Sequence, residues 1–417
     1  MMKSFMFSNV LRTFIKDEKE IPTGVKLIVF VIFLRTLGWG FVDPFIPMYF
    51  REFNNNYALI GLFISLMPVG ALLAIIPLMR LADKIKDTVL IRDGEVVYFF
   101  TILLFVLAGL SKNVILVIAA QLLCGVGHSL MIVGTESYIR KHNLLGQSKP
   151  FGLYMALDYG GWVLGMVIGA FTIQYYGFSW MFLAILPSIL AGLLILPIIH
   201  EEGIGSLFFG IKKYFHKRQD FIDIFEDIRE LSPKMFFFLF LAFFDGVILM
   251  FFVAFIPLLG LSINLSLKHI ALLMAVTYLP FVFSFFFSEI TDRFCRMNVI
   301  TAGLFVGAMS YFLLYFIVDQ MWVVALIAMT SFSMAIIRPV YNGTITRLSP
   351  RRMLGEVTGF NNFFNRLGRI FGPILTGVIA SIYGIQTCFL VVAISAFVFG
   401  IVSVTLHGYN HLAVQAD

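Results

Sequence analysis

Long apolar runs dominate the pattern of hydrophobic and polar positions along this chain of 417 residues. Twelve runs each have about 20 residues, the length that an α-helix needs to cross the hydrocarbon core of a bilayer. They cover residues 25–50, 57–79, 89–110, 114–135, 151–174, 179–199, 235–260, 269–288, 299–318, 321–341, 358–381 and 385–407. The pattern predicts an all-α integral membrane protein with twelve transmembrane helices.

A polar segment separates the first six runs from the last six. It combines a basic stretch with an acidic one, and its interspersed apolar residues leave open an amphipathic helix on the membrane surface as the alternative to a plain linker. The expected domains are a cytoplasmic N-terminal segment (1–24), two six-helix bundles (25–200 and 235–407), a cytoplasmic linker (201–234) and a cytoplasmic tail (408–417).

The two sets of six runs repeat one another. An offset of 207 residues matches Gly161 with Gly368, Gly165 with Gly372, and Tyr176-Gly177 with Tyr383-Gly384; an offset of 210 matches Phe45-Ile46-Pro47 with Phe255-Ile256-Pro257. Duplicated halves are typical of alternating-access transporters, which bind their substrate near the bilayer centre between the halves. The repeat therefore predicts two pseudo-symmetric bundles with a binding site between them.

Positive charges indicate the orientation of the chain. Of the 30 Lys and Arg residues, 23 lie in or beside the N-terminal segment and the even-numbered connections, and only Arg51, Lys112 and Lys268 lie in the odd-numbered ones. Positively charged loops stay in the cytoplasm. We therefore expect both termini to be cytoplasmic and the protein to reside in the cell membrane.

Composition narrows the class of protein further. Apolar residues make up 60% of the chain and charged residues 13%, against about a quarter charged in soluble proteins. The net charge of +6 is explained by cytoplasmic loops, so we expect the lipid bilayer and not nucleic acid as partner. The three cysteines are far apart, and there is no nucleotide-binding loop or clustered catalytic set. We expect no metal, no cofactor, no enzymatic activity and a monomer.

Two short connections carry an aspartate beside a basic residue, Asp83-Lys84 and Asp292-Arg293. They resemble the Gly-x-x-x-Asp-Arg-x-Gly-Arg-Arg signature of the major facilitator superfamily. The resemblance implies twelve helices in two pseudo-symmetric six-helix bundles, a small-molecule substrate, and a conformational latch formed by Asp83, Asp292 and Arg293.

Other signatures of that family are incomplete or displaced. Residues 121–125 lack the arginine of an Arg-x-x-Gln-Gly motif, and the Gly-Pro of the antiporter motif lies in the eleventh run, at Gly372-Pro373, and not in the fifth. The first run, with small residues before Pro44 and Pro47, is similar to the first helix of efflux-type members. Because proline removes a backbone hydrogen bond, we expect these two residues to bend the helix near its external end.

Charged side chains inside the runs are the candidate functional residues, because each costs at least about 2.5–3.5 kcal/mol on insertion scales. In the superfamily, helices 1, 4, 7 and 10 line the central pathway. The resemblance therefore implies that the pathway is lined by Arg35, Asp43, His128, Asp245 and Arg338. Trp39 lies on the same row as Arg35 and Asp43 and is a candidate substrate contact.

The repeat relates two of these charges directly. At the offset of 210, Arg35 and Asp245 occupy equivalent positions, so we hypothesise that they form or alternate in a charge pair, with a static structural pair as the alternative. Protons are the expected coupling ion. Desolvation favours the neutral form of a carboxylate, which makes Asp43 and Asp245 the candidate proton carriers.

Further charges lie nearer the cytoplasmic ends of the runs. We expect Asp158, Arg366 and Arg369 to form ion pairs that close the cytoplasmic side. Asp93 and Glu95 are expected to be satisfied at the inner membrane boundary beside Arg92.

Two transport readings remain open. The first is proton-coupled efflux of an amphipathic compound, which fits the first run and the 48 phenylalanines. The second is uptake or exchange of an organic anion bound by Arg35 and Arg338.

Overall fold

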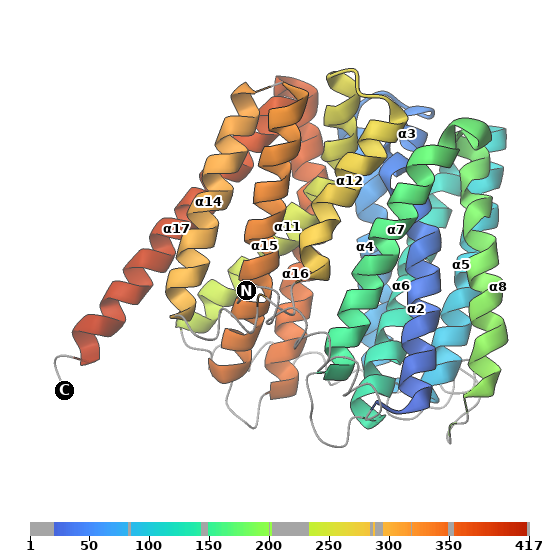
Figure 1. The fold of residues 1–417 in the computed structure, drawn as a ribbon, viewed down its shortest axis with the longest axis horizontal. Helices are drawn as coiled ribbons and strands as arrows, with labels where there is room; N and C mark the ends of the chain where they lie inside the picture. Colours follow the sequence, from blue (N-terminus) through green and yellow to red (C-terminus); the bar gives the residue numbers. More distant parts are fainter. Residues whose placement is uncertain are drawn as a thin grey trace, which may run out of the picture.

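The computed structural model describes residues 21–81, 85–142, 149–199, 201, 233–283, 287, 295–317, 319–348 and 354–414. Almost all of them are helical, and the helices run side by side in two groups (Figure 1). Ten of the described helical segments are long and apolar enough to cross a membrane. The prediction of an all-α integral membrane protein is confirmed.

Among the described residues, the first group contains six helical rods, which are blue to green in Figure 1. Its first rod is α2 (Thr23–Val42), which continues through the 3₁₀ turn η2 (Asp43–Phe45) into α3 (Ile46–Arg51). The next four are α4 (Tyr57–Leu81), α5 (Asp87–Ser111), α6 (Val114–His142) and α7 (Lys149–Trp180). The sixth combines η3 (Met181–Ile185), α8 (Leu186–Ile195) and η4 (Leu196–Ile198).

The second group, yellow to red, also contains six helices among the described residues. They are α11 (Pro233–Ser262), α12 (Leu267–Val282), α14 (Arg296–Phe316), α15 (Gln320–Leu348), α16 (Leu354–Tyr383) and α17 (Ile385–Val414). The twelve rods coincide with the twelve predicted runs. We call the two groups the N-terminal half and the C-terminal half.

The bundle has two ends. We call one the α3 end; here short turns join α3 to α4, α5 to α6, α7 to η3, α11 to α12, α14 to α15 and α16 to α17. We call the other the terminal end, because the described chain begins there at α2 and finishes there at α17 (Figure 1).

The glycines matched by the repeat have equivalent structural roles in the two halves. Gly177 and Gly384 both adopt positive φ, at 67° and 89°, where their helices turn at the α3 end. L-residues with a side chain rarely adopt this conformation, so glycine is favoured at both turns. Pro44 of the first rod lies in the 3₁₀ turn that interrupts the helix, and Pro47 lies in the first turn of α3, which follows it.

Two helix pairs make most of the contacts between the halves, α4 with α16 and α7 with α12. At the α3 end, the seam between α4 and α16 is tight because it is built on glycines. A Cβ on Gly377 would lie 2.7 Å from the Tyr57 carbonyl oxygen and 3.1 Å from the Ala58 Cα. The Ala58 amide also donates to the Ser381 hydroxyl at 2.9 Å.

Candidate functional site

Asp245 and Arg338 form an ion pair in the C-terminal half. Asp245, on α11, accepts on one oxygen from Nε and Nη2 of Arg338 on α15, at 3.1 and 2.8 Å. Its other oxygen accepts from the Tyr341 hydroxyl and from the Asn365 amide, both at 3.0 Å. Only 5% of the Asp245 side chain and 18% of the Arg338 side chain are exposed. With both carboxylate oxygens bonded to donors, this buried pair is well satisfied.

Arg338 also connects this pair to the other half. Its Nη1 donates to the Tyr159 hydroxyl of α7 at 2.8 Å. Its guanidinium lies 4.7 Å from the centre of the Phe281 ring on α12, and the Tyr159 ring stacks on Phe281. Next to them, Trp162 of α7 stacks on Tyr278 of α12. The seam between α7 and α12 is therefore aromatic, with one paired cation at its edge.

Arg35 forms an ion pair within the N-terminal half. Its Nη2 lies 3.3 Å from a carboxylate oxygen of Asp158 on α7. Arg35 is buried, whereas 21% of the Asp158 side chain is exposed. Among the described residues, Nε of Arg35 has no hydrogen-bond partner. This long contact satisfies the guanidinium only in part.

The predicted pair between Arg35 and Asp245 is therefore not formed in this structure. Each charge is paired within its own half, Arg35 with Asp158 and Asp245 with Arg338. The physical reason is side-chain direction: equivalence in the repeat puts two residues at the same depth, but they meet only if both point at the axis between the halves.

The other predicted pathway residues lie close to this region. Asp43, in η2, is 7% exposed, interacts with Tyr278 of the other half, and has one oxygen without a partner among the described residues. His128 of α6 is half-buried, with Nδ1 3.4 Å from the Tyr98 hydroxyl. Trp39 is buried against the Tyr98 ring. Asp43 thus reaches the seam, whereas Trp39 offers little accessible surface in this conformation.

Asp158, Arg366 and Arg369, which were expected to close the cytoplasmic side, do not pair with one another. Asp158 is held by Arg35 in its own half and not by the arginines of α16. Arg369 donates to Asn365 at 2.9 Å, and Arg366 interacts electrostatically with Glu136 of α6 in the other half. The predicted latch residues Asp83, Asp292 and Arg293 lie outside the described residues.

Sequence reasoning missed a polar face on α16. Asn365 bonds to Asp245, and the side chain of Asn361 bonds to Asn342 of α15 at 2.9 Å. With Arg369, these residues recur every four positions, which puts them on one face of the helix. That four-residue spacing is visible in the sequence, but a criterion based on charge selects Arg369 and passes over the two asparagines.

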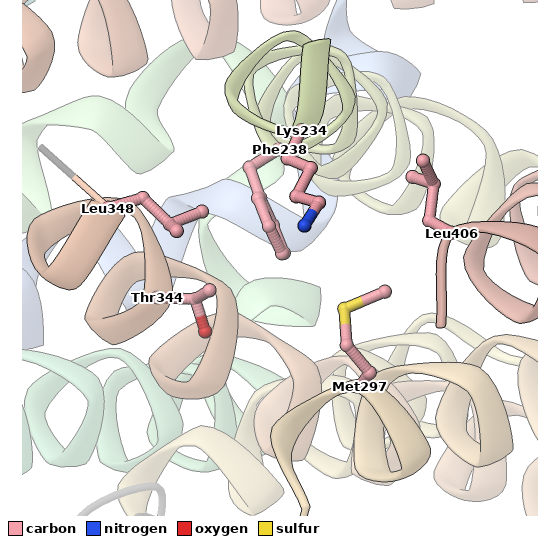
Figure 2. Close-up of a pocket in the computed structure, with 6 residues that line it drawn as sticks. All are labelled: Lys234, Phe238, Met297, Thr344, Leu348 and Leu406. Carbon is pink, nitrogen blue, oxygen red and sulfur yellow. The ribbon is translucent and has the colours of Figure 1, made fainter. Parts of the chain in front are cut away.

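A separate apolar pocket of about 140 Å³ lies inside the C-terminal half, toward the terminal end (Figure 2). Its lining residues come from α11, α14, α15 and α17: Lys234, Phe238, Met297, Thr344, Leu348 and Leu406. It contains none of the charged residues described above and lies away from the seam between α7 and α12.

Curated relatives cover most of the chain at low identity. The "Quinolone resistance protein NorA" of Staphylococcus aureus (strain COL) is 22% identical over 374 residues, which are 86% of this chain and 90% of the relative. The "Multidrug resistance protein 1" of Bacillus subtilis (strain 168) is 22% identical over 360 residues, covering 84% of this chain and 88% of the relative.

Solved structures share the fold. A point mutant of the nucleoside transporter NupG matches with a TM-score of 0.75 and 12% identity over 92% of this chain and 99% of that one. A POT family transporter in complex with 5-aminolevulinic acid matches with a TM-score of 0.70 and 14% identity, covering 92% and 96%. The Major Facilitator Superfamily model matches residues 28–372 and 235–408. The resemblance inferred from the loop motifs is thus confirmed, and the chain belongs to the Major Facilitator Superfamily.

Proposed function

We propose that this secondary active transporter, which is not an enzyme, exports an amphipathic organic compound in exchange for protons. The observation that carries the proposal is the pairing of both arginines. Arg35 and Arg338 each contact a carboxylate, Asp158 and Asp245. The alternative reading, in which these two arginines bind an organic anion, requires the anion to displace a carboxylate from each, and we therefore favour efflux.

The seam supports an amphipathic substrate. Four aromatic rings from α7 and α12 line up along it, those of Tyr159, Trp162, Tyr278 and Phe281. Aromatic faces hold flat apolar groups and also attract cations. The names of the relatives reported above, quinolone resistance and multidrug resistance, agree with a substrate of this kind.

Orientation follows from the distribution of positive charge. The connections at the terminal end carry most of the Lys and Arg residues, which supports placing that end in the cytoplasm. The α3 end is then external, and it is the end at which Gly377 closes against Tyr57 and Ser381 bonds to Ala58. We therefore interpret this conformation as closed to the outside.

Proton coupling is assigned to carboxylates at the interface. Asp43 has an oxygen without a partner among the described residues, and Asp245 carries the contact between Arg338 and its own half. Protonation of Asp245 weakens its hold on Arg338, and with it the link from Arg338 to Tyr159 across the seam. Proton binding at Asp245 thereby weakens the contact between Arg338 and Tyr159, which joins the two halves.

The test is transport into proteoliposomes made with the purified protein and loaded with a pH-sensitive dye. With the interior more acidic by one unit, proton efflux drives a fluorescent quinolone inward, to a limit of about tenfold accumulation for one-to-one exchange without charge movement. Asp245→Asn should abolish accumulation. Glu52→Gln, which alters an exposed ion pair with Lys112, is the matched control.

The direction of the gradient separates the two readings. Export by proton exchange requires accumulation with an acidic interior, whereas uptake with protons requires accumulation with an alkaline one. Accumulation of an organic anion such as benzoate, but not of the quinolone, would favour the anion reading. No flux of either compound under either gradient would contradict both.

A further inference from the structure

The N-terminal half contains a buried carboxylate for which the described residues supply no hydrogen-bond donor. Glu95, on α5, has no exposed surface, and within the described part of the chain neither of its carboxylate oxygens has a partner. The expectation that Glu95, like Asp93, is satisfied beside Arg92 is therefore wrong. Arg92 pairs with Asp93 at 2.7 Å, and Glu95 points the other way, into the half.

Glycine in α8 leaves room for this carboxylate. A Cβ on Gly192 would lie 3.3 Å from Oε1 of Glu95 and 3.2 Å from a methyl group of Val31 on α2. Neither α8 nor η3, which also pack on α5, contains a titratable residue. On these two sides Glu95 therefore has no titratable neighbour.

The titratable groups near Glu95 come from four helices. Arg35 of α2 interacts electrostatically with it, as does Tyr98 of α5. Around these two lie Cys124 and His128 of α6, and Tyr154 and Asp158 of α7. Arg35 is the cation close to Glu95, and it is shared with Asp158.

One arginine thus serves two carboxylates. Arg35 holds Asp158 by Nη2 at 3.3 Å, while its Nε has no partner in the described residues. An ionised carboxylate without a donor is strongly disfavoured in an apolar interior, whereas the neutral acid is not. With a single proton on either acid, the cluster of Arg35, Glu95 and Asp158 has no net charge.

We propose that the transported proton also occupies Glu95 and Asp158 during the cycle, and that Arg35 pairs with whichever of these two carboxylates is ionised. In this conformation Glu95 carries the proton and Arg35 pairs with Asp158. When the proton passes from Glu95 to Asp158, Arg35 moves to the newly formed Glu95 carboxylate. Asp158 exchanges the proton with water, because its side chain is 21% exposed and Glu95 is not exposed at all.

This movement acts on the contact between the halves. Asp158 is followed directly on α7 by Tyr159, which accepts the hydrogen bond from Arg338 across the seam. When Arg35 releases Asp158, α7 loses its ion pair to α2 at the residue next to Tyr159. A proton held in the N-terminal half therefore controls the strength of the aromatic seam.

The inference rests on the proposed function, and the experiment uses the full-length protein in proteoliposomes. Glu95→Gln keeps the size of the side chain and fixes it in the neutral state. We expect exchange of the quinolone between equal concentrations inside and outside to persist, while the roughly tenfold accumulation driven by one pH unit is lost. Asp93→Asn, two residues away in an exposed pair, is the control and should accumulate substrate like the wild type.

Infrared spectroscopy gives a second readout that does not depend on transport. The C=O stretching band of a buried protonated carboxylic acid should be present in the wild-type protein at neutral pH and absent from Glu95→Gln. A wild-type protein without this band, or a Glu95→Gln protein that accumulates substrate with unchanged proton stoichiometry, overturns the inference. If instead the wild-type protein shows no pH-driven flux but the band is lost on substitution, the proposed function fails and proton binding by Glu95 stands.

Discussion

Gly377 offers a direct way to hold the α3 end open. A Cβ at this position would lie 2.7 Å from the Tyr57 carbonyl oxygen, 3.1 Å from the Ala58 Cα and 3.4 Å from the Gly61 Cα. All three are backbone atoms of α4, which cannot rotate away as the end of a side chain does. In Gly377→Leu, the new side chain therefore fits only if α4 and α16 separate.

The size of the effect follows from where the contact lies. Because α4 and α16 belong to different halves, separating them leaves the packing within each half intact. Overpacking of a tight contact costs typically about 1–3 kcal/mol. Applied to the equilibrium between the closed and open α3 end, this shifts the ratio of the two states by roughly 5- to 150-fold.

Double electron-electron resonance between two spin labels reports this opening. The labels are placed at Asn55 and Gln320, two exposed residues at the α3 end in different halves. Gly377→Leu should move the distance distribution to longer values and slow transport. Gly160→Leu is the matched control, because a Cβ at Gly160 meets no atom within 4 Å. An unchanged distance distribution together with normal transport in Gly377→Leu would refute the idea that this glycine closes the α3 end.

Three further predictions concern single side chains. Asp245→Asn leaves Arg338 without its carboxylate, which typically costs about 3–5 kcal/mol, so thermal unfolding in detergent should occur at a lower temperature. Adding Arg338→Gln to this variant should restore part of the lost stability, and no recovery would contradict the pairing. Tyr159→Phe keeps the stacking on Phe281 but removes a hydrogen bond to a charged group, typically about 1.5–3 kcal/mol, so substrate exchange should change several-fold, and an unchanged rate would argue against a role of this bond in the cycle. Glu201 accepts from the backbone amides of the first two residues of α5, so Glu201→Ala should lower the unfolding temperature through the loss of about 0.5–2 kcal/mol, whereas equal unfolding temperatures would show that the cap contributes nothing.

The arrangement of helices could be predicted because bilayer thickness fixes the length of a span. The second run, predicted over 57–79, corresponds to α4, Tyr57–Leu81. Polar interruptions then define where each helix ends. No comparable constraint specifies the rotation of a helix about its own axis when its faces are almost equally apolar, as in α2. The depth of Arg35 was therefore predictable, whereas its partner was not.

The surroundings of Glu95 could not be predicted from the sequence either. Two residues from Asp93 on a helix, it lies on roughly the opposite face, so the two acids have different surroundings although they are neighbours in the sequence. The partly exposed acid, Asp93, pairs with Arg92, and the buried one has no donor among the described residues. Only the packing of α5 against its neighbouring helices, mainly α6 and α8, distinguishes them.

The repeat does explain why the two halves carry their charges differently. The offsets of 210 and 207 relate Arg35 and Asp158 to Asp245 and Asn365, and both pairs are in contact, at 3.3 and 3.0 Å. The offset of 210 also relates His128 to Arg338. Where the C-terminal half joins an aspartate to an arginine, the N-terminal half therefore has an arginine and a histidine, two bases that cannot form an ion pair. Arg35 must find its carboxylates on other helices, and α7 and α5 supply them.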